Sequence, residues 1–232
     1  MLLVKQWTSD LLGLLFPNLC NACGNSLFRH EQLICIKCLY DLPFTDYHQY
    51  ADNRVAKQLW GRLPLNAAMA MLYFRKGAKV QNLIHNLKYN GRTDVGVLLG
   101  NMLGERLKPA ILYQGIDIVI PVPLHRKKFK TRGYNQSTFI ADGIAAQMGI
   151  DINENHLIRN TATESQTKKS RYNRYENMKD VFQVNSPEDI IGKHILLVDD
   201  VITTGATLEA CANALLATGA AKVSIAALAF AE

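Results

Sequence analysis

The segment 195–207 constrains the fold more than any other part of this chain. It begins with an apolar, β-branched run, Ile-Leu-Leu-Val, which is typical of a strand buried on both faces of a parallel sheet. Two adjacent carboxylates, Asp199 and Asp200, come next, and the small-residue segment 203–207 follows them. Residues 208–216 then continue at helical spacing. The sequence therefore predicts a strand, an acidic pair, a short loop and a helix N-terminus in direct succession.

This succession suits the binding of a phosphorylated sugar. The unpaired N–H groups at a helix start, together with the positive end of its dipole, attract phosphate. Gly205 permits close approach of the backbone, and the neighbouring threonine hydroxyls add hydrogen-bond donors. Asp199 and Asp200 can accept hydrogen bonds from vicinal ribose hydroxyls. A buried strand whose acidic pair only caps the next turn is the alternative, and the Thr-Thr-Gly-Ala-Thr segment behind the pair disfavours it.

The same residues resemble the ribose-phosphate signature of the type I phosphoribosyltransferases, which bind phosphoribosyl pyrophosphate (PRPP). The resemblance implies that Asp199 and Asp200 are catalytic carboxylates holding the ribose 2′ and 3′ hydroxyls, and that the loop cradles the 5′-phosphate. It also implies Mg²⁺ bound together with PRPP. The substrate-binding residues that it implies here are Val201, Thr203, Thr204, Gly205, Ala206 and Thr207.

Four of the five cysteines lie in two C-x-x-C units, Cys20 with Cys23 and Cys35 with Cys38. This spacing is typical of a zinc knuckle, in which four thiolates hold one ion tetrahedrally and stabilise a segment too small to bury a core. Because four cysteines leave no open coordination position, the expected zinc is structural. Two disulfides and an iron–sulfur cluster are the alternatives, and an intracellular chain disfavours disulfides. Cys211 lies at helical spacing and is interpreted as a core residue.

Composition indicates a soluble globular protein with anionic partners. Charged residues make up 20% of the chain and hydrophobic residues 48%, and the formal net charge is +6. No apolar run approaches the ~20 residues of a membrane-spanning helix. Residues 1–16 are rich in apolar side chains but carry Lys5 and Asp10 and lack a small-residue cleavage site. A signal peptide is therefore disfavoured, and a cytoplasmic location is expected.

Strand and helix patterns alternate along the rest of the chain. Strands are expected at 67–74, 116–123, 182–184, 194–198 and 223–228, and helices at 80–90, 95–107 and 136–148. Such alternation predicts an α/β fold with a mainly parallel twisted sheet flanked by helices. Ligands bind outside the carboxyl ends of such strands, so the acidic pair and the segment 121–123 should share one crevice. We expect two domains, an N-terminal helix with the four-cysteine zinc knuckle at 1–50 and a phosphoribosyltransferase-like domain at 51–232.

Further motifs resemble a single family. Pro-Val-Pro-Leu-His at 121–125, Arg-Gly-Tyr-Asn-Gln at 132–136, the basic segment 166–177 and Leu-Lys-Tyr at 87–89 accompany the C-x-x-C pairs. Together they resemble the ComF family, which includes ComFC-like and GntX-like proteins. That family joins an N-terminal zinc-binding motif to a phosphoribosyltransferase-like domain, and its members are linked to natural competence and DNA utilisation. The resemblance covers nearly the whole chain.

Two basic segments are expected to line a pocket for a polyanion. The family architecture implies a pyrophosphate-binding loop at the strand end after Val119, with four candidate ligands: Arg126, Lys127, Lys128 and Arg132. A solvated basic loop is the alternative there. The segment 166–177 corresponds to a mobile loop that closes over PRPP, with Lys168 and Arg171 as candidates, or else to an exposed linker. Lys88 could reach the same pocket, but it is interpreted as a surface lysine on its helix.

Two kinds of function are compatible with these residues. The first is an enzyme that binds PRPP with Mg²⁺ and transfers the phosphoribosyl group to an unidentified acceptor, in DNA uptake, competence or DNA utilisation. The second is a non-catalytic adaptor that senses PRPP or a nucleotide and binds single-stranded DNA, a competence helicase or another DNA-processing protein. No segment specifies a nucleobase acceptor, so the motifs predict the bound ligand but not the reaction product.

Overall fold

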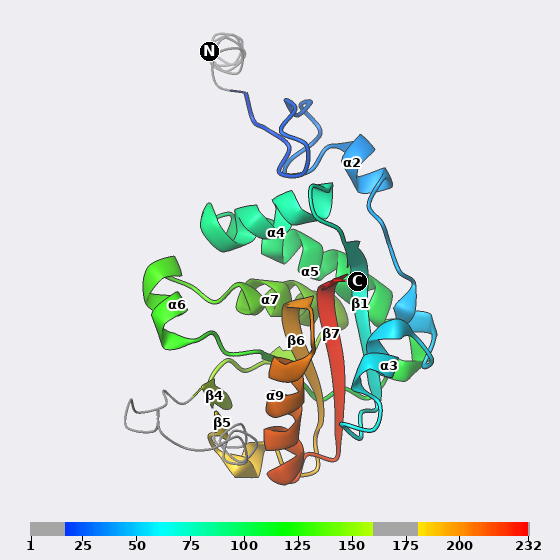
Figure 1. Ribbon diagram of the computed structural model, residues 1–232, viewed down its shortest axis with the longest axis vertical. Coiled ribbons are helices and arrows are strands. Elements are labelled where there is room, and N and C mark those ends of the chain that lie inside the picture. The colour runs from blue at the N-terminus through cyan, green and yellow to red at the C-terminus, as the bar shows by residue number, and fades with distance from the viewer. Residues whose placement is uncertain (1–16, 160–180, 232) are drawn as a thin grey trace.

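A five-stranded parallel sheet forms the centre of the molecule (Figure 1). The computed structural model describes residues 17–159 and 181–231. The strand order is β1-β7-β6-β2-β3. The strands are β1 (Ala67–Phe74), β2 (Ile118–Pro121), β3 (Asp151–Ile152), β6 (His194–Ile202) and β7 (Lys222–Ala231). The central strand β6 has fully buried residues from 195 to 198, as its continuous apolar run predicts.

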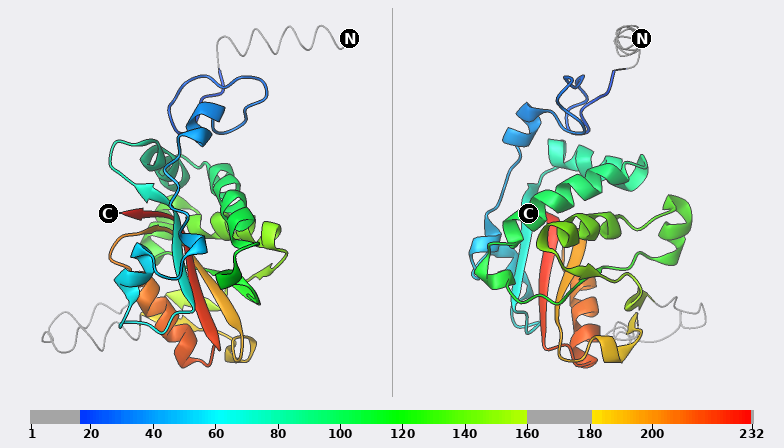
Figure 2. Two further views of the ribbon diagram at one scale, coloured as in Figure 1. Left: turned by 90° about the vertical axis from the view of Figure 1, so that its right-hand side faces the viewer. Right: turned by 180° about the vertical axis from the view of Figure 1, so that it is seen from behind.

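Helices cover both faces of this sheet, which Figure 2 shows edge-on. On one face α5 (Thr93–Leu107) and α7 (Gln136–Met148) pack against each other, with α4 (Lys79–Tyr89) beside α5. On the opposite face α9 (Ala206–Ala217) packs against β6 and β7. The predicted α/β class with a parallel sheet flanked by helices is confirmed.

Shorter elements complete the described chain. The short α-helices are α2 (Ile36–Tyr40), α3 (Arg54–Leu59) and α6 (Arg126–Arg132). Single 3₁₀ turns occur at Tyr47–Gln49, Ile111–Tyr113 and Pro187–Asp189. β4 (Leu157–Arg159) and β5 (Phe182–Val184) form a separate antiparallel pair. No helix within 17–159 or 181–231 is both long and apolar enough to span a membrane.

Most expected elements are present, with two informative differences. β6 continues through the acidic pair, because β7 extends far enough to pair with Asp199 and with residues 201 and 202. The basic segment after β2 is the helix α6 and not a loop. His125 caps α6 by accepting a hydrogen bond from the Lys127 amide, and Gly133 ends it with a positive φ. The expected N-terminal helix and the segment 166–177 lie outside the described residues.

The segment between the cysteine cluster and α3 runs along the free edge of β1. Thr45 donates its backbone N–H to Met71, and the Tyr73 amide donates to Pro43. The Thr45 hydroxyl also donates to the Ala70 carbonyl at 2.5 Å. These bonds cover an edge that would otherwise present unpaired backbone groups. The division of the chain at residue 50 stays a prediction.

Close packing of α5 on α7 depends on glycine at the contact. A Cβ atom built at Gly143 would lie 2.4 Å from the carbonyl oxygen of Val97 and 2.6 Å from the amide nitrogen of Asn101. A Cβ atom at Gly100 would lie 2.2 Å from the carbonyl oxygen of Ile140. The backbones of the two helices therefore touch, and this contact sets the position of the N-terminus of α7 beside β6.

We expect Gly143→Ala to destabilise the protein by about 2 kcal/mol. Alanine favours a helix interior by ~1 kcal/mol over glycine, but the clash with backbone atoms of α5 costs ~3 kcal/mol. The shift of the urea unfolding midpoint measures the effect. Ala146→Gly, at an exposed position of the same helix, is the matched control and should cost only ~1 kcal/mol. A Gly143→Ala protein as stable as the wild type would contradict the close contact.

Candidate functional site

The acidic pair lies near the carboxyl end of the central strand β6. Asp200 is only 4% exposed, whereas Asp199 is partly accessible. Asp199 Oδ1 accepts a hydrogen bond from the hydroxyl of Ser137 at 3.1 Å, and Ser137 is the second residue of α7. The same carboxylate oxygen accepts the Asp200 backbone N–H at 2.8 Å. The α7 N-terminus therefore holds one of the two carboxylates in place.

A lysine from α4 holds the other carboxylate. Lys88 Nζ lies 2.9 Å from each of the two carboxylate oxygens of Asp200. The Lys88 side chain is 22% exposed, so the pair is largely removed from solvent. The prediction that Lys88 is a surface lysine is therefore wrong. Spacing on the helix could not reveal the contact, because 112 residues separate the partners in the chain.

Burial and charge change the titration of the acidic pair. Burial and the neighbouring Asp200 carboxylate raise the pKa of Asp199 to about 7, although Lys88 and the Ser137 hydroxyl oppose the shift. An unfolded aspartate has a pKa of ~3.9, so the folded protein binds this proton more tightly. The carboxyl group therefore makes the fold less stable as the pH rises from about 4 to 7. A group held at such a cost is typical of a functional site.

The Thr/Gly loop (residues 203–207) connects β6 to α9. Thr203, Thr204 and Thr207 are exposed, and Gly205 adopts a φ of +74° directly before the helix. Within the described parts of the chain, the backbone N–H groups of residues 203, 204 and 205 donate no hydrogen bond. Val201 lies in β6, and Ala206 is the first residue of α9. The loop thus presents free donors and hydroxyls at the end of the strand that carries the acidic pair.

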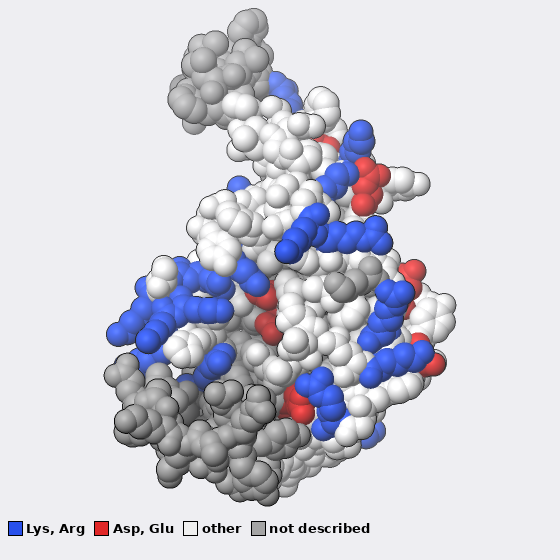
Figure 3. Space-filling model, viewed as in Figure 1, with Lys and Arg blue, Asp and Glu red and all other residues white. Residues whose placement is uncertain are grey.

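The basic residues of α6 form a projecting patch beside this strand end. Figure 3 shows Lys and Arg side chains gathered over α6, with acidic atoms set back between them and the centre of the face. Arg126, Lys127 and Lys128 are exposed. Arg132 is half-buried, lies 5.5 Å from the Tyr89 ring centroid and donates to Gln136. Lys168 and Arg171 lie outside the described residues.

Arg132 is the residue of this group that the fold turns inward. Tyr89 follows Lys88 at the end of α4, and Gln136 opens α7 next to Ser137. The Tyr134 hydroxyl also donates to the Leu87 carbonyl at 2.5 Å. The end of α4, the segment after α6 and the start of α7 therefore meet around the acidic pair.

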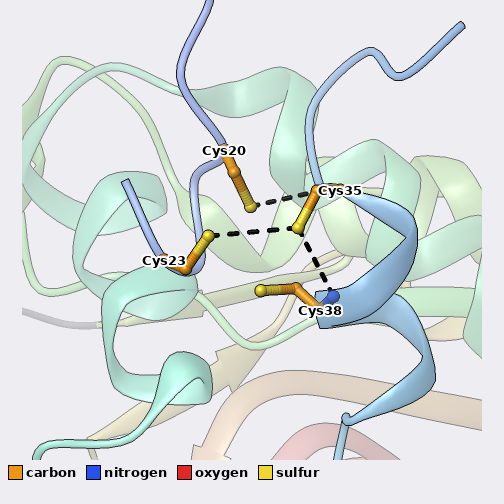
Figure 4. A group of neighbouring side chains, drawn as sticks. All are labelled: Cys20, Cys23, Cys35 and Cys38. Atoms are coloured by element: carbon orange, nitrogen blue, oxygen red, sulfur yellow. Dashed lines mark hydrogen bonds between the residues drawn. The ribbon is translucent and has the colours of Figure 1, made fainter. Parts of the chain in front are cut away.

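The four N-terminal cysteines form a cluster that can hold a metal ion (Figure 4). Their sulfur atoms all lie within 4.8 Å of one another, and Cys23 Sγ lies 3.9 Å from Cys35 Sγ. Tetrahedral ligation with Zn–S bonds of ~2.3 Å places sulfurs ~3.8 Å apart, so the arrangement fits zinc. None of the five cysteines forms a disulfide in the structure. Cys211 is fully buried, as predicted.

Helix α4 connects the cysteine cluster with the acidic pair. The Asn82 side chain donates to the carbonyl of Ala22 at 2.8 Å, and the Asn86 side chain donates to that of Asn21 at 2.9 Å. Both carbonyls lie between Cys20 and Cys23. Since Lys88 is on the same helix, the four-cysteine segment supports the helix whose lysine pairs with Asp200.

A protein-family model and several known proteins are similar to this chain. The family model described as "Phosphoribosyl transferase domain" matches residues 136–232, which include α7, the acidic pair and the Thr/Gly loop. The chain is 29% identical over 211 residues to DNA utilization protein YhgH of Shigella flexneri, covering 89% of this chain and 88% of that protein. It is 34% identical over 110 residues to competence protein ComFC of Bacillus subtilis (strain 168), covering 46% of this chain and 42% of that protein.

A solved structure shows a weaker likeness. A glutamine PRPP amidotransferase from B. subtilis matches 62% of this chain and 30% of its own, with a TM-score of 0.44 and 22% identity. The homologues, the matched domain and the cysteine cluster confirm the resemblance seen in the sequence. The chain is therefore similar to the ComF proteins over most of its length, and residues 136–232 match a phosphoribosyltransferase-type domain.

We expect Lys88→Met to destabilise the protein by about 2 kcal/mol. The substitution leaves the Asp200 carboxylate buried without its cation, and this costs more than the pair contributes. Lys79→Met is the matched control on the same helix, since Lys79 pairs with Asp41 at the surface. That change should cost at most ~1 kcal/mol. Urea unfolding at pH 8 measures both, and equal losses would contradict the buried pair.

Proposed function

We propose that this protein binds PRPP with Mg²⁺ and transfers the phosphoribosyl group to an acceptor. One observation carries the proposal: an acidic pair, of which Asp200 is buried, lies at the same strand end as a loop with unpaired amides, with basic residues nearby. A ribose 5-phosphate needs anion donors at one end and hydroxyl acceptors at the other. The Thr/Gly loop supplies the anion donors and the pair Asp199–Asp200 supplies the hydroxyl acceptors, and both lie where β6 leads into α9.

Each part of the substrate has a counterpart in the chain. The loop amides and the threonine hydroxyls bind the 5′-phosphate. Asp199 and Asp200 accept hydrogen bonds from the ribose 2′ and 3′ hydroxyls, with Ser137 orienting the first carboxylate. The pyrophosphate extends toward the end of α4 and the start of α7, where Lys88 and the inward-facing Arg132 provide positive charge.

The chemistry is the displacement of pyrophosphate from ribose C1 by a nucleophile. Positive charge develops on the sugar and negative charge on the leaving group, so preorganised charges lower the barrier. The carboxylates of Asp199 and Asp200 are the hard oxygen donors that Mg²⁺ prefers, and the bound ion would neutralise the pyrophosphate. Lys88 and Arg132 would add to this neutralisation, and the Asp carboxylates hold the ribose in position.

The names of the homologues suggest the cellular context. They are DNA utilization and competence proteins, so we propose that the transfer serves the uptake or utilisation of DNA. For the four-cysteine cluster we propose structural zinc. Four thiols complete a tetrahedral set and leave no position for a reacting water.

Wild-type protein should bind PRPP in the presence of Mg²⁺, and the double variant Asp199→Asn, Asp200→Asn should bind it at least about tenfold more weakly. The amides can still contact the hydroxyls but lose the charge that strengthens the hydrogen bonds, which is worth ~1.4 kcal/mol or more. Isothermal titration calorimetry measures the affinity. Asp151→Asn, at an exposed carboxylate on β3, is the matched control.

Equal affinity of the double variant and the wild type would refute the assigned site. Turnover is followed as pyrophosphate release with a panel of nucleobases and ammonia. Binding without release for any acceptor would instead favour the non-catalytic adaptor. A mobility shift of single-stranded DNA across a salt series then tests direct DNA contact, since phosphate contacts weaken steeply with salt.

Protein purified without added metal should contain close to one zinc per chain. Elemental analysis measures the content, and a strong chelator should lower the melting temperature because metal ligation stabilises the fold of the knuckle. Cys23→Ser should reduce zinc retention, whereas Cys211→Ser should leave the zinc content unchanged, because Cys211 is buried in α9. Metal-free protein with an unchanged melting temperature would rule out structural zinc.

A further inference from the structure

The Thr/Gly loop is contacted by a part of the chain that lies outside the matched phosphoribosyltransferase domain. Gln58 Nε2 of α3 donates to the Thr203 carbonyl at 2.5 Å, and Arg62 Nη1 donates to the Thr204 carbonyl at 3.2 Å. Arg62 also pairs with Glu209 in the first turn of α9. Two side chains, 145 and 142 residues away from their acceptors, therefore bind successive carbonyls of the loop.

These two bonds determine where the loop amides point. In a trans peptide the C=O and the N–H lie in one plane and point in opposite directions, and the described chain has no cis peptide bonds. Because the carbonyls of Thr203 and Thr204 point toward α3 and its following turn, the N–H groups of Thr204 and Gly205 point away from it. Those are the amides that donate to no partner within 17–159 and 181–231. The contacts thus orient free donors toward the open side of the loop.

Leu59 fixes the loop sterically from the same side. A Cβ atom at Gly205 would lie 2.8 Å from Leu59 Cδ2, and the φ of +74° is itself unfavourable for other residues. Gly205 therefore lets the loop sit directly on α3. Leu59 is 1% exposed, which shows that the contact is part of the core.

α3 is in turn anchored to the central sheet. Asn53 caps it by accepting the Ala56 amide at 3.0 Å, and the Asn53 side chain donates to the Ala68 carbonyl of β1 at 2.9 Å. Asn53 is 6% exposed. The position of Gln58 is thereby tied to β1, so the contacts on the loop come from a fixed support.

We propose that Gln58 and Arg62 are positioning residues for the 5′-phosphate, which hold the Thr/Gly loop so that its amides face the ligand. This inference rests on the proposed function of the site. Arg62 acts through the loop rather than as a counter-charge, because it binds the carbonyl side and is already paired with Glu209. Loss of the two side chains frees the peptide units to rotate. Ligand binding must then order the loop, and the entropy cost of this ordering lowers the affinity.

The test compares two probes, ribose 5-phosphate and inorganic pyrophosphate, by isothermal titration calorimetry. Gln58→Leu combined with Arg62→Met should weaken ribose 5-phosphate binding about tenfold to a hundredfold. Pyrophosphate binding with Mg²⁺ should stay within about twofold of the wild type, because Lys88 and Arg132 lie elsewhere. Arg62→Lys keeps the charge but loses the planar fork of donors, so it should also weaken ribose 5-phosphate binding.

Lys57→Met is the matched control, because it removes an exposed cation of α3 that pairs with Asp52 and has no bond to the loop. It should bind both probes like the wild type. Melting temperatures identify variants that fail to fold. If the double variant does not fold, the test is made with Arg62→Lys, which is the mildest change. Wild-type affinity of the double variant or of Arg62→Lys for ribose 5-phosphate would overturn the positioning role alone. Failure of the wild-type protein to bind ribose 5-phosphate or PRPP would overturn the proposed function together with this role.

Discussion

The buried ion pair between Lys88 and Asp200 is the interaction around which this molecule is organised. Two adjacent carboxylates near the end of a central strand repel each other and lose hydration, and the raised pKa of Asp199 records that cost. The fold offsets it with elements from distant parts of the chain. α4 brings a cation to Asp200, and the N-terminus of α7 brings the Ser137 hydroxyl to Asp199. The placement of both helices is therefore a requirement of the acidic pair.

Two structural supports maintain this arrangement. α7 can reach β6 because glycines let it touch the backbone of α5. α4 is held at its other side by the cysteine segment, whose carbonyls accept the side chains of Asn82 and Asn86. The N-terminal knuckle is thus more than an appendage, since it packs on the helix that carries Lys88. The Thr/Gly loop has its own support in α3, which Asn53 connects to β1.

A large part of the fold could be predicted from residue patterns. The 2.0 and 3.6 periodicities locate β1, α4, α5, α7 and β7 to within a few residues, because each has one buried face or is buried entirely. α6 could not be predicted in this way, since it has no buried residue and hence no apolar periodicity. α3 is one and a half turns long, which is too short for a periodic pattern to reveal. Its residue Gln58 and the following Arg62 carry no motif that marks them as neighbours of residue 203.

The sequence by itself determined the resemblance to the ComF family, the parallel α/β class, the four grouped cysteines and the order of acidic pair, loop and helix. Each of these features depends on contiguous residues or on short spacings, so the local sequence is enough to predict it. Only the tertiary structure decided that Lys88 neutralises Asp200, that Arg132 faces inward while its basic neighbours face solvent, and that α3 turns the loop amides outward. Those facts depend on contacts between residues 100 or more positions apart, or on which face of a short helix packs inward, and packing of the whole chain decides both.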